Sequence, residues 1–168
     1  MGEELTSLDV LLRLTVAMVC GGVIGWERGW SNHSAGLRTQ ILVAIGSAGF
    51  VIISLRWQPN QTGEGLYQLD PFRVLQGIIG GVGLIAGGAI IYGKSSVRGL
   101  TTASAVWAVT AIGTACGFGQ FDLAGILTVM TLFVTGLLVY IDPKEHEEKK
   151  ELEDARSGLR SPEELPPE

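Results

Sequence analysis

Five long apolar stretches dominate this 168-residue chain and leave few folds open to it. They are Leu8–Trp26, Leu37–Trp57, Phe72–Tyr92, Gly99–Gly117 and Asp122–Ile141. A helix of about 20 apolar residues crosses the ~30 Å hydrocarbon core of a bilayer. A soluble domain of this size has too much surface to bury five helices that are apolar all round. The pattern therefore predicts an all-α fold, a polytopic membrane bundle of five transmembrane helices.

Charged residues gather in the last part of the chain. Residues 1–141 carry seven basic and seven acidic side chains, whereas residues 142–168 carry five basic and ten acidic ones, so the whole net charge of −5 belongs to the tail. We therefore divide the chain into a transmembrane domain, residues 1–141, and a charged cytoplasmic tail, residues 142–168, whose composition predicts disorder. Because no segment has an excess of Lys and Arg, a nucleic-acid-binding surface is excluded.

The distribution of basic residues predicts the orientation in the membrane. Basic residues follow the first and third apolar stretches and recur in the tail, at Arg28, Arg38, Lys94, Arg98, Lys144, Lys149 and Lys150. The opposite side carries fewer of them, chiefly Arg56 and Arg73. Since cytoplasmic loops are enriched in Lys and Arg, we expect the N-terminus outside and the C-terminus in the cytoplasm.

Glycines recur four residues apart within the predicted helices. The pairs are Gly21/Gly25, Gly77/Gly81, Gly83/Gly87 and Gly113/Gly117. Helices in lipid associate by close backbone contact at small residues. The sequence therefore predicts packing glycines that join helices, bind other membrane proteins or join two copies of the chain, namely Gly77, Gly81, Gly83, Gly87 and Gly88. A groove that lines a polar path or a ligand pocket is the alternative. Residues 81–86 also match the dinucleotide-binding fingerprint GxGxxA, but that fingerprint requires a preceding strand, which the sequence lacks, so nucleotide binding is not predicted.

The few charges inside the apolar stretches should face the bundle and find partners, because charge at membrane depth is costly. We predict an outer cluster of Arg13, Asp70 and Arg73, and an inner cluster of Glu27 with Arg38 or Arg98. These clusters are either structural ties or the core of a site for an ion or a protein partner.

Glu27 and Asp70 lie at opposite ends, so they cannot share a metal ion, and no metal site is predicted. His33 and His146 lack the neighbours of a catalytic or metal-binding set, so neither enzyme activity nor a cofactor is expected.

Several motifs resemble the MgtC/SapB family of bacterial inner-membrane proteins, over residues 9–141. They are residues 11–14 (LLRL), 25–28 (GWER), 35–39 (AGLRT), 70–73 (DPFR), 81–90 (GVGLIAGGAI) and 97–103 (VRGLTTA), with Trp107 behind the last. The resemblance implies a multi-pass protein of the inner membrane that serves growth in low magnesium. The family is grouped with magnesium transport and is also linked to regulation of the membrane ATP synthase. Its motif positions fall here on Glu27, Arg28, Arg38, Asp70, Arg73, Arg98 and the glycine run.

The chain departs from the family pattern at Gln40, where His is common, and at Ala86-Gly87, where Gly-Ala is common. Many members also end in a folded cytoplasmic domain, which the 142–168 tail is too short to form. Two functions remain open. A regulatory protein that contacts other membrane proteins is favoured by the glycine-rich faces. A transporter or channel for Mg²⁺ or another small solute would need a polar path, for which the sequence offers Thr101, Thr102, Thr110 and Thr114.

Overall fold

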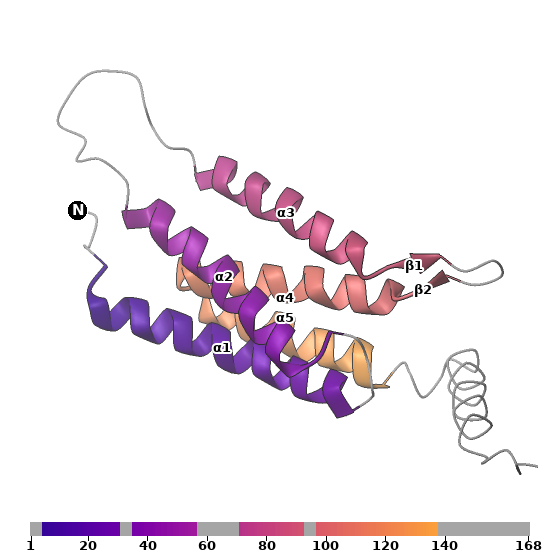
Figure 1. Ribbon diagram of the computed structural model, residues 1–168. Helices are drawn as coiled ribbons and strands as arrows, with labels where there is room; N and C mark the ends of the chain where they lie inside the picture. Colours follow the sequence, from indigo (N-terminus) through magenta and orange to yellow (C-terminus); the bar gives the residue numbers. More distant parts are fainter. Residues whose placement is uncertain (1–4, 31–34, 57–70, 93–96, 138–168) are drawn as a thin grey trace, which may run out of the picture.

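The computed structural model describes residues 5–30, 35–56, 71–92 and 97–137, which form five α-helices and one small β-hairpin (Figure 1). The helices are α1 (Ser7–Trp30), α2 (Leu37–Arg56), α3 (Pro71–Gly88), α4 (Leu100–Phe118) and α5 (Phe121–Leu132), which continues as the π-helical turn η1 (Phe133–Leu137). The predicted helical fold is therefore confirmed. By length and composition, α1, α2 and α4 can cross a membrane, whereas α3 and α5 are shorter apolar helices.

Two helix ends differ from those that the apolar stretches predict. Helix α1 continues past Trp26 to Trp30, because the charged pair that follows Trp26 still fits the helix. Helix α3 ends at Gly88 instead of Tyr92, and the antiparallel strands β1 (Ile91–Tyr92) and β2 (Val97–Arg98) follow it. Paired glycines weaken a helix, and the β-branched and aromatic residues after them favour a strand. The predicted tail, residues 142–168, lies outside the described residues.

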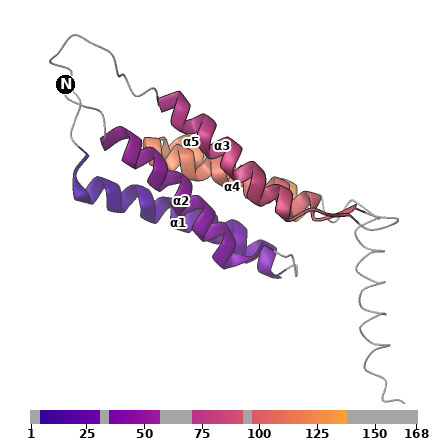
Figure 2. The same cartoon turned by 45° about the horizontal axis from the view of Figure 1, so that its top comes forward.

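Helices α1 and α3 lie on opposite sides of the α2 and α4 pair (Figures 1 and 2). One group of buried side chains joins α1, α2, α4 and α5, and it includes Ala17, Ala44, Ile112, Cys116 and Ala124. A second group joins α2, α3 and α4, and it includes Val51, Ile78, Val82 and Val106. Most of these side chains are small, so the helix backbones approach closely. Helix α4 is the most extensively buried of the five.

Local interactions determine where α1 and α4 begin and end. At the start of α1, the Asp9 N–H donates to Thr6 Oγ1 (3.3 Å) and the Thr6 N–H donates to Asp9 Oδ2 (3.0 Å), which forms a capping box. Helix α4 lies between two glycines with positive φ, Gly99 (87°) and Gly119 (78°). A Cβ at Gly99 would overlap the carbonyl oxygen of Ala89, so both backbone angle and space require glycine there.

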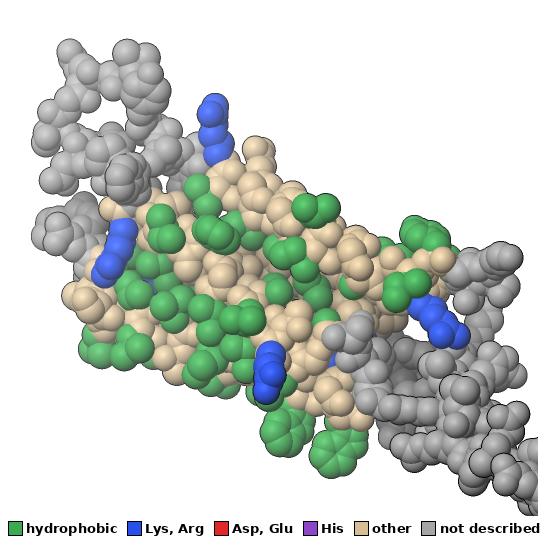
Figure 3. Space-filling view, viewed as in Figure 1, with side chains coloured by type: hydrophobic (Ala, Val, Ile, Leu, Met, Phe, Trp, Pro, Cys, Tyr) green, Lys and Arg blue, Asp and Glu red, His purple; other side chains and the backbone are tan. Residues whose placement is uncertain are grey.

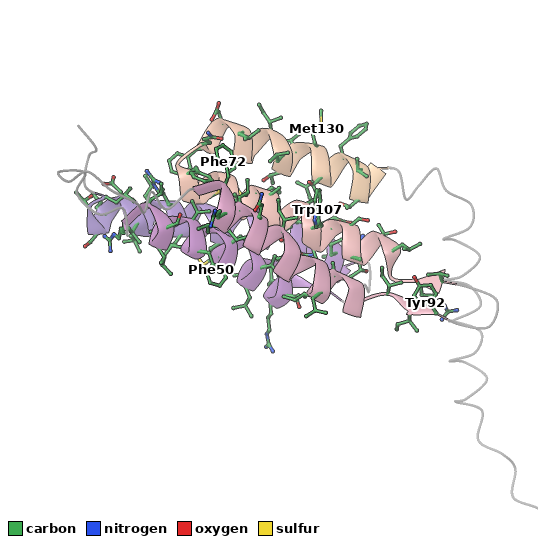
Figure 4. All side chains as sticks on the ribbon, turned by 90° about the horizontal axis from the view of Figure 1, so that it is seen from above. Phe50, Phe72, Tyr92, Trp107 and Met130 are labelled. Carbon is green, nitrogen blue, oxygen red and sulfur yellow. The ribbon has the colours of Figure 1, made fainter. Side chains whose placement is uncertain are left out.

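The outer surface of the bundle is apolar. Figure 3 shows hydrophobic side chains along the described helices on this face, a few Lys or Arg side chains at its margins, and no visible Asp or Glu. Large apolar side chains are exposed on several helices, and Met130 points away from α5 (Figure 4). A soluble domain rarely exposes so much contiguous apolar surface, whereas a bilayer solvates it.

Candidate functional site

Five polar side chains lie at one end of the bundle, where α1 and α5 end and α2 and α4 begin. We call this set the inner polar layer; it comprises Glu27, Arg28, Gln40, Thr102 and Thr135. Arg28 and Gln40 are 0% exposed, and the two threonines are also buried. Buried polar groups of this kind require partners within the protein, because the surrounding apolar side chains offer none.

Arg28 ties α1 to α4. Its Nη2 donates a hydrogen bond to Thr102 Oγ1 at 3.1 Å. Arg28 lies one turn beyond the buried residues Ile24 and Gly25, so it continues the face of α1 that packs into the bundle. An arginine stays protonated at any physiological pH. The inner polar layer therefore holds a permanent positive charge inside an apolar bundle.

Glu27 ties α1 to the π-helical turn η1. Thr135 Oγ1 donates to Glu27 Oε2 at 3.0 Å and also to the carbonyl oxygen of Thr131, one turn earlier, at 3.0 Å. The predicted partners of Glu27, Arg38 and Arg98, are both exposed, and their pairing with Glu27 stays a prediction. A threonine on a helix carries no motif that links it to a distant carboxylate, so the Thr135 contact could not be predicted.

Gln40 is buried between α1 and α2, with neither amide atom in a hydrogen bond to a described residue. Glycine in α1 makes room for it, since a Cβ at Gly25 would lie 3.1 Å from the Cβ of Gln40. A Cβ at Gly21 would lie 2.8 Å from the carbonyl oxygen of Gln40. The sequence marked this residue only as a departure from a family pattern. In the fold, its amide offers an unused donor and an unused acceptor to the inner polar layer.

Arg13 lies at the opposite end of the bundle and binds the end of a helix. Its Nη1 donates to the carbonyl oxygen of Gly117 at 2.6 Å, in the last turn of α4. The last carbonyls of a helix lack intrahelical donors and carry partial negative charge, so a guanidinium stabilises them. The predicted partner Asp70 lies outside the described residues, so its pairing with Arg13 stays a prediction. Arg73 is exposed in the first turn of α3.

The glycines fall into two groups. In α1 and α4 they touch α2, because a Cβ at Gly21 would lie 2.8 Å from the Ala44 Cβ and one at Gly117 would lie 2.8 Å from the Ala48 oxygen. In α3, a Cβ at any of five glycines would meet no heavy atom of the described residues within 4 Å outside the helix's own backbone, namely at Gly77, Gly81, Gly83, Gly87 and Gly88. These five positions are therefore open among the described residues. Their predicted role in packing against another molecule stays a prediction.

Two apolar clefts flank α3. The α2–α3 cleft has a volume of about 650 Å³, and its lining includes Gly46, Phe50, Val74, Gly77, Gly81 and Ile85. The α3–α4 cleft has a volume of about 420 Å³, and its lining includes Gly83, Gly87, Ala103, Ser104 and Trp107. Each cleft thus takes one of the two GxxxG pairs of α3.

Apolar helices, exposed apolar faces and a few buried, hydrogen-bonded charges define a helical membrane protein. Residues 14–143 match the MgtC family, and the chain belongs to that family. This confirms the resemblance seen in the motifs.

The chain is similar to three named relatives. It is 43% identical over 124 residues to an uncharacterized protein of Synechocystis sp., covering 74% of this chain and 50% of that protein. It is 37% identical over 138 residues to Protein MgtC of Salmonella typhimurium, covering 82% of this chain and 56% of that protein. It is 37% identical over 126 residues to YhiD of Escherichia coli K12, covering 75% of this chain and 59% of that protein. The name of YhiD describes it as a candidate magnesium transporter. The chain thus spans little more than half the length of these relatives. No solved structure matches it.

Proposed function

We propose that this protein is a multi-pass protein of the bacterial inner membrane that serves magnesium homeostasis by regulating other membrane proteins, without catalysing a reaction. The family membership and the name of one relative, YhiD, support the link to magnesium. In this proposal all five apolar helices span the bilayer, with the N-terminus outside and the C-terminus in the cytoplasm.

One observation carries the regulatory proposal: three charged side chains of α1 bond to other helical segments. Arg28 binds Thr102, Glu27 binds Thr135, and Arg13 binds the end of α4. Such bonds support a fixed scaffold. The apolar surface of α3 and its open glycines remain available for contact with a helix of another protein, since small residues permit close backbone approach.

A transporter or channel for Mg²⁺ or another small solute is the second candidate, and the name of YhiD favours it. Its polar path would follow the threonines of α4, of which Thr101 is exposed and the others are buried. Thr102 already accepts a bond from Arg28, and Thr110 Oγ1 donates to the carbonyl of Val106 at 2.9 Å. Thr114 Oγ1 is buried without a bond to a described residue. The hydroxyl of Thr114 is therefore the best test position for a path.

Mg²⁺ uptake into liposomes that contain the purified full chain distinguishes the two candidates. The regulatory proposal expects uptake equal to that of protein-free liposomes. Uptake that saturates with Mg²⁺ concentration and falls at least tenfold in Thr114→Val would overturn it in favour of transport. Thr15→Val, on the exposed face of α1 and outside the proposed path, is the matched control.

A second experiment tests the regulatory proposal in cells. It measures growth at low magnesium of a strain that lacks the gene. The wild-type chain should restore growth, and Gly87→Leu in the α3–α4 cleft should not, because the leucine blocks contact with a partner helix. Gly80→Leu should restore growth, since Gly80 is exposed on the same helix and lines neither cleft. Equal growth with both variants would contradict regulation through this face.

A further inference from the structure

The α2–α3 cleft has the dimensions of a site for an extended chain. Its lining on α3 runs from Val74 to Ile85, about 16 Å along the helix at 1.5 Å per residue. The cleft has a volume of about 650 Å³ and is open along one side. A space of this length and volume accommodates an extended hydrocarbon chain.

The lining of this cleft is apolar almost throughout. Ser47 is the one hydroxyl among the side chains that line it, and its Oγ already donates to the carbonyl of Val43 at 2.8 Å. Gly77 and Gly81 add no side chain, and a Cβ at either would meet nothing within 4 Å. At these two positions the cleft is therefore wide enough that even a Cβ would touch no other described residue. In a bilayer, apolar space that opens to the side is filled by apolar groups of the lipid.

A positive charge directly precedes the first α3 residue that lines the cleft, Val74. Arg73 precedes Gly77 by four residues, so the two share one face of α3, and the Arg73 side chain is exposed. Helical side chains lean toward the N-terminus, which here is the end of α3 nearest the membrane surface. A long arginine side chain reaches the headgroup region in this way and offers two parallel donors to a phosphate.

We propose that the α2–α3 cleft binds one anionic phospholipid, with an acyl chain between Gly77 and Phe50 and the phosphate at Arg73. The inference rests on the membrane insertion that the proposed function includes, but not on regulation or transport. Extraction of cell membranes with alkaline carbonate tests insertion separately. A chain released by carbonate contradicts insertion, whereas a chain that is retained but binds no lipid contradicts only the present inference.

Native mass spectrometry of the full chain, with phosphatidylglycerol or phosphatidylcholine added, tests the site. The wild-type protein should retain one phosphatidylglycerol. Gly81→Leu fills the cleft and should weaken this binding at least tenfold, whereas the matched Gly80→Leu should not change it. Arg73→Gln should remove the preference for phosphatidylglycerol over phosphatidylcholine. Equal binding by Gly81→Leu and Gly80→Leu would overturn the proposal, and so would a dimer, instead of bound lipid, that Gly81→Leu abolishes.

A second measurement uses only the wild-type chain and is therefore independent of how well the variants fold. Phosphatidylglycerol with a photoactivatable acyl chain should label α2 and α3 at the cleft in preference to the exposed face of α5, where Val129 and Met130 lie. Labelling of α5 equal to that of the cleft would show general contact with the bilayer and would contradict a specific site.

Discussion

The glycines of α1 and α4 and the glycines of α3 occur in the same sequence pattern but in opposite surroundings. Gly21 and Gly113 lie where a Cβ would approach α2 within 3 Å. Gly77 and Gly83 lie beside clefts, where a Cβ would touch nothing within 4 Å. A GxxxG pair therefore identifies a helix face that permits close approach, but only the fold tells whether another helix of the same chain is there.

The largest effect on stability should come from a substitution among the glycines of α1 and α4, which lie against α2. Gly113→Ala places a methyl group 2.9 Å from the Cα of Ala44 and against its carbonyl oxygen, so α2 and α4 must move apart. We expect a loss of about 3 kcal/mol in the free energy of unfolding, because this contact is with backbone and cannot relax by rotamer change. Unfolding in mixed micelles with increasing SDS measures the loss. Gly22→Ala, which would meet only the Ile41 side chain at 3.6 Å, should change it little.

The second prediction concerns the tie between α1 and α4. Thr102→Val keeps the shape of the side chain but removes the acceptor of the Arg28 bond, and a bond from a charged donor is worth about 1.5–3 kcal/mol. We expect the same unfolding assay to show a loss of about 2 kcal/mol. Thr102→Ser should restore most of it, and Thr101→Val, on the exposed face one residue earlier, should be neutral. A neutral Thr102→Val would mean that the Thr102 bond adds little to the stability of the bundle.

The third prediction concerns the opposite end of the bundle. Arg13→Gln removes the positive charge from the last turn of α4, where a cation contributes about 1 kcal/mol. Arg13→Lys should retain part of this contribution, because the charge remains while the guanidinium geometry is lost. Thermal unfolding in a mild detergent should give the highest unfolding temperature for the wild type, a lower one for Arg13→Lys and the lowest for Arg13→Gln. If the Lys and Gln variants are equally destabilised, the bond geometry at Gly117 matters more than the charge.

The smallest effect should have the opposite sign. Gly83→Ala adds a methyl group in open space and reduces the freedom of the unfolded backbone, so we expect stabilisation of about 0.5–1 kcal/mol. If Gly83→Ala is destabilised as much as Gly113→Ala, the glycines of α3 and α4 do not differ in their surroundings in this way. A variant that is more stable but no longer restores growth at low magnesium would show that another molecule occupies this face in the cell.

The order of the described helices and the lengths of α2 and α4 could be predicted from the sequence, because hydrocarbon thickness imposes a length on apolar stretches. The hairpin could not, since Ile91 and Tyr92 simply extend an apolar stretch and nothing local separates a buried helix from a short strand. The partner of Arg13 was also beyond reach. Side-chain patterns suggest carboxylates such as Asp70, whose pairing with Arg13 stays a prediction, whereas Arg13 also donates to a backbone carbonyl at the end of α4.

Burial of Gln40 and the bond between Thr135 and Glu27 depend on how α1, α2 and η1 meet in space. Sequence reasoning selected Glu27 and Arg28 because ionisable residues are rare in apolar stretches. It had no comparable reason to select an amide or a hydroxyl, which helices tolerate at many positions. The neutral members of the inner polar layer therefore emerge only from the fold.

The two left-handed glycines that bound α4 determine how thick a bilayer the protein matches best. Between Gly99 and Gly119 the helix has 19 residues, about 28 Å in length, close to the hydrocarbon thickness of an average membrane. Neither end can add a helical turn, because both flanking residues have left-handed backbone angles. In a thicker bilayer the protein must therefore tilt less or thin the lipid around it. Lipid composition would then act on the whole bundle through its most buried helix.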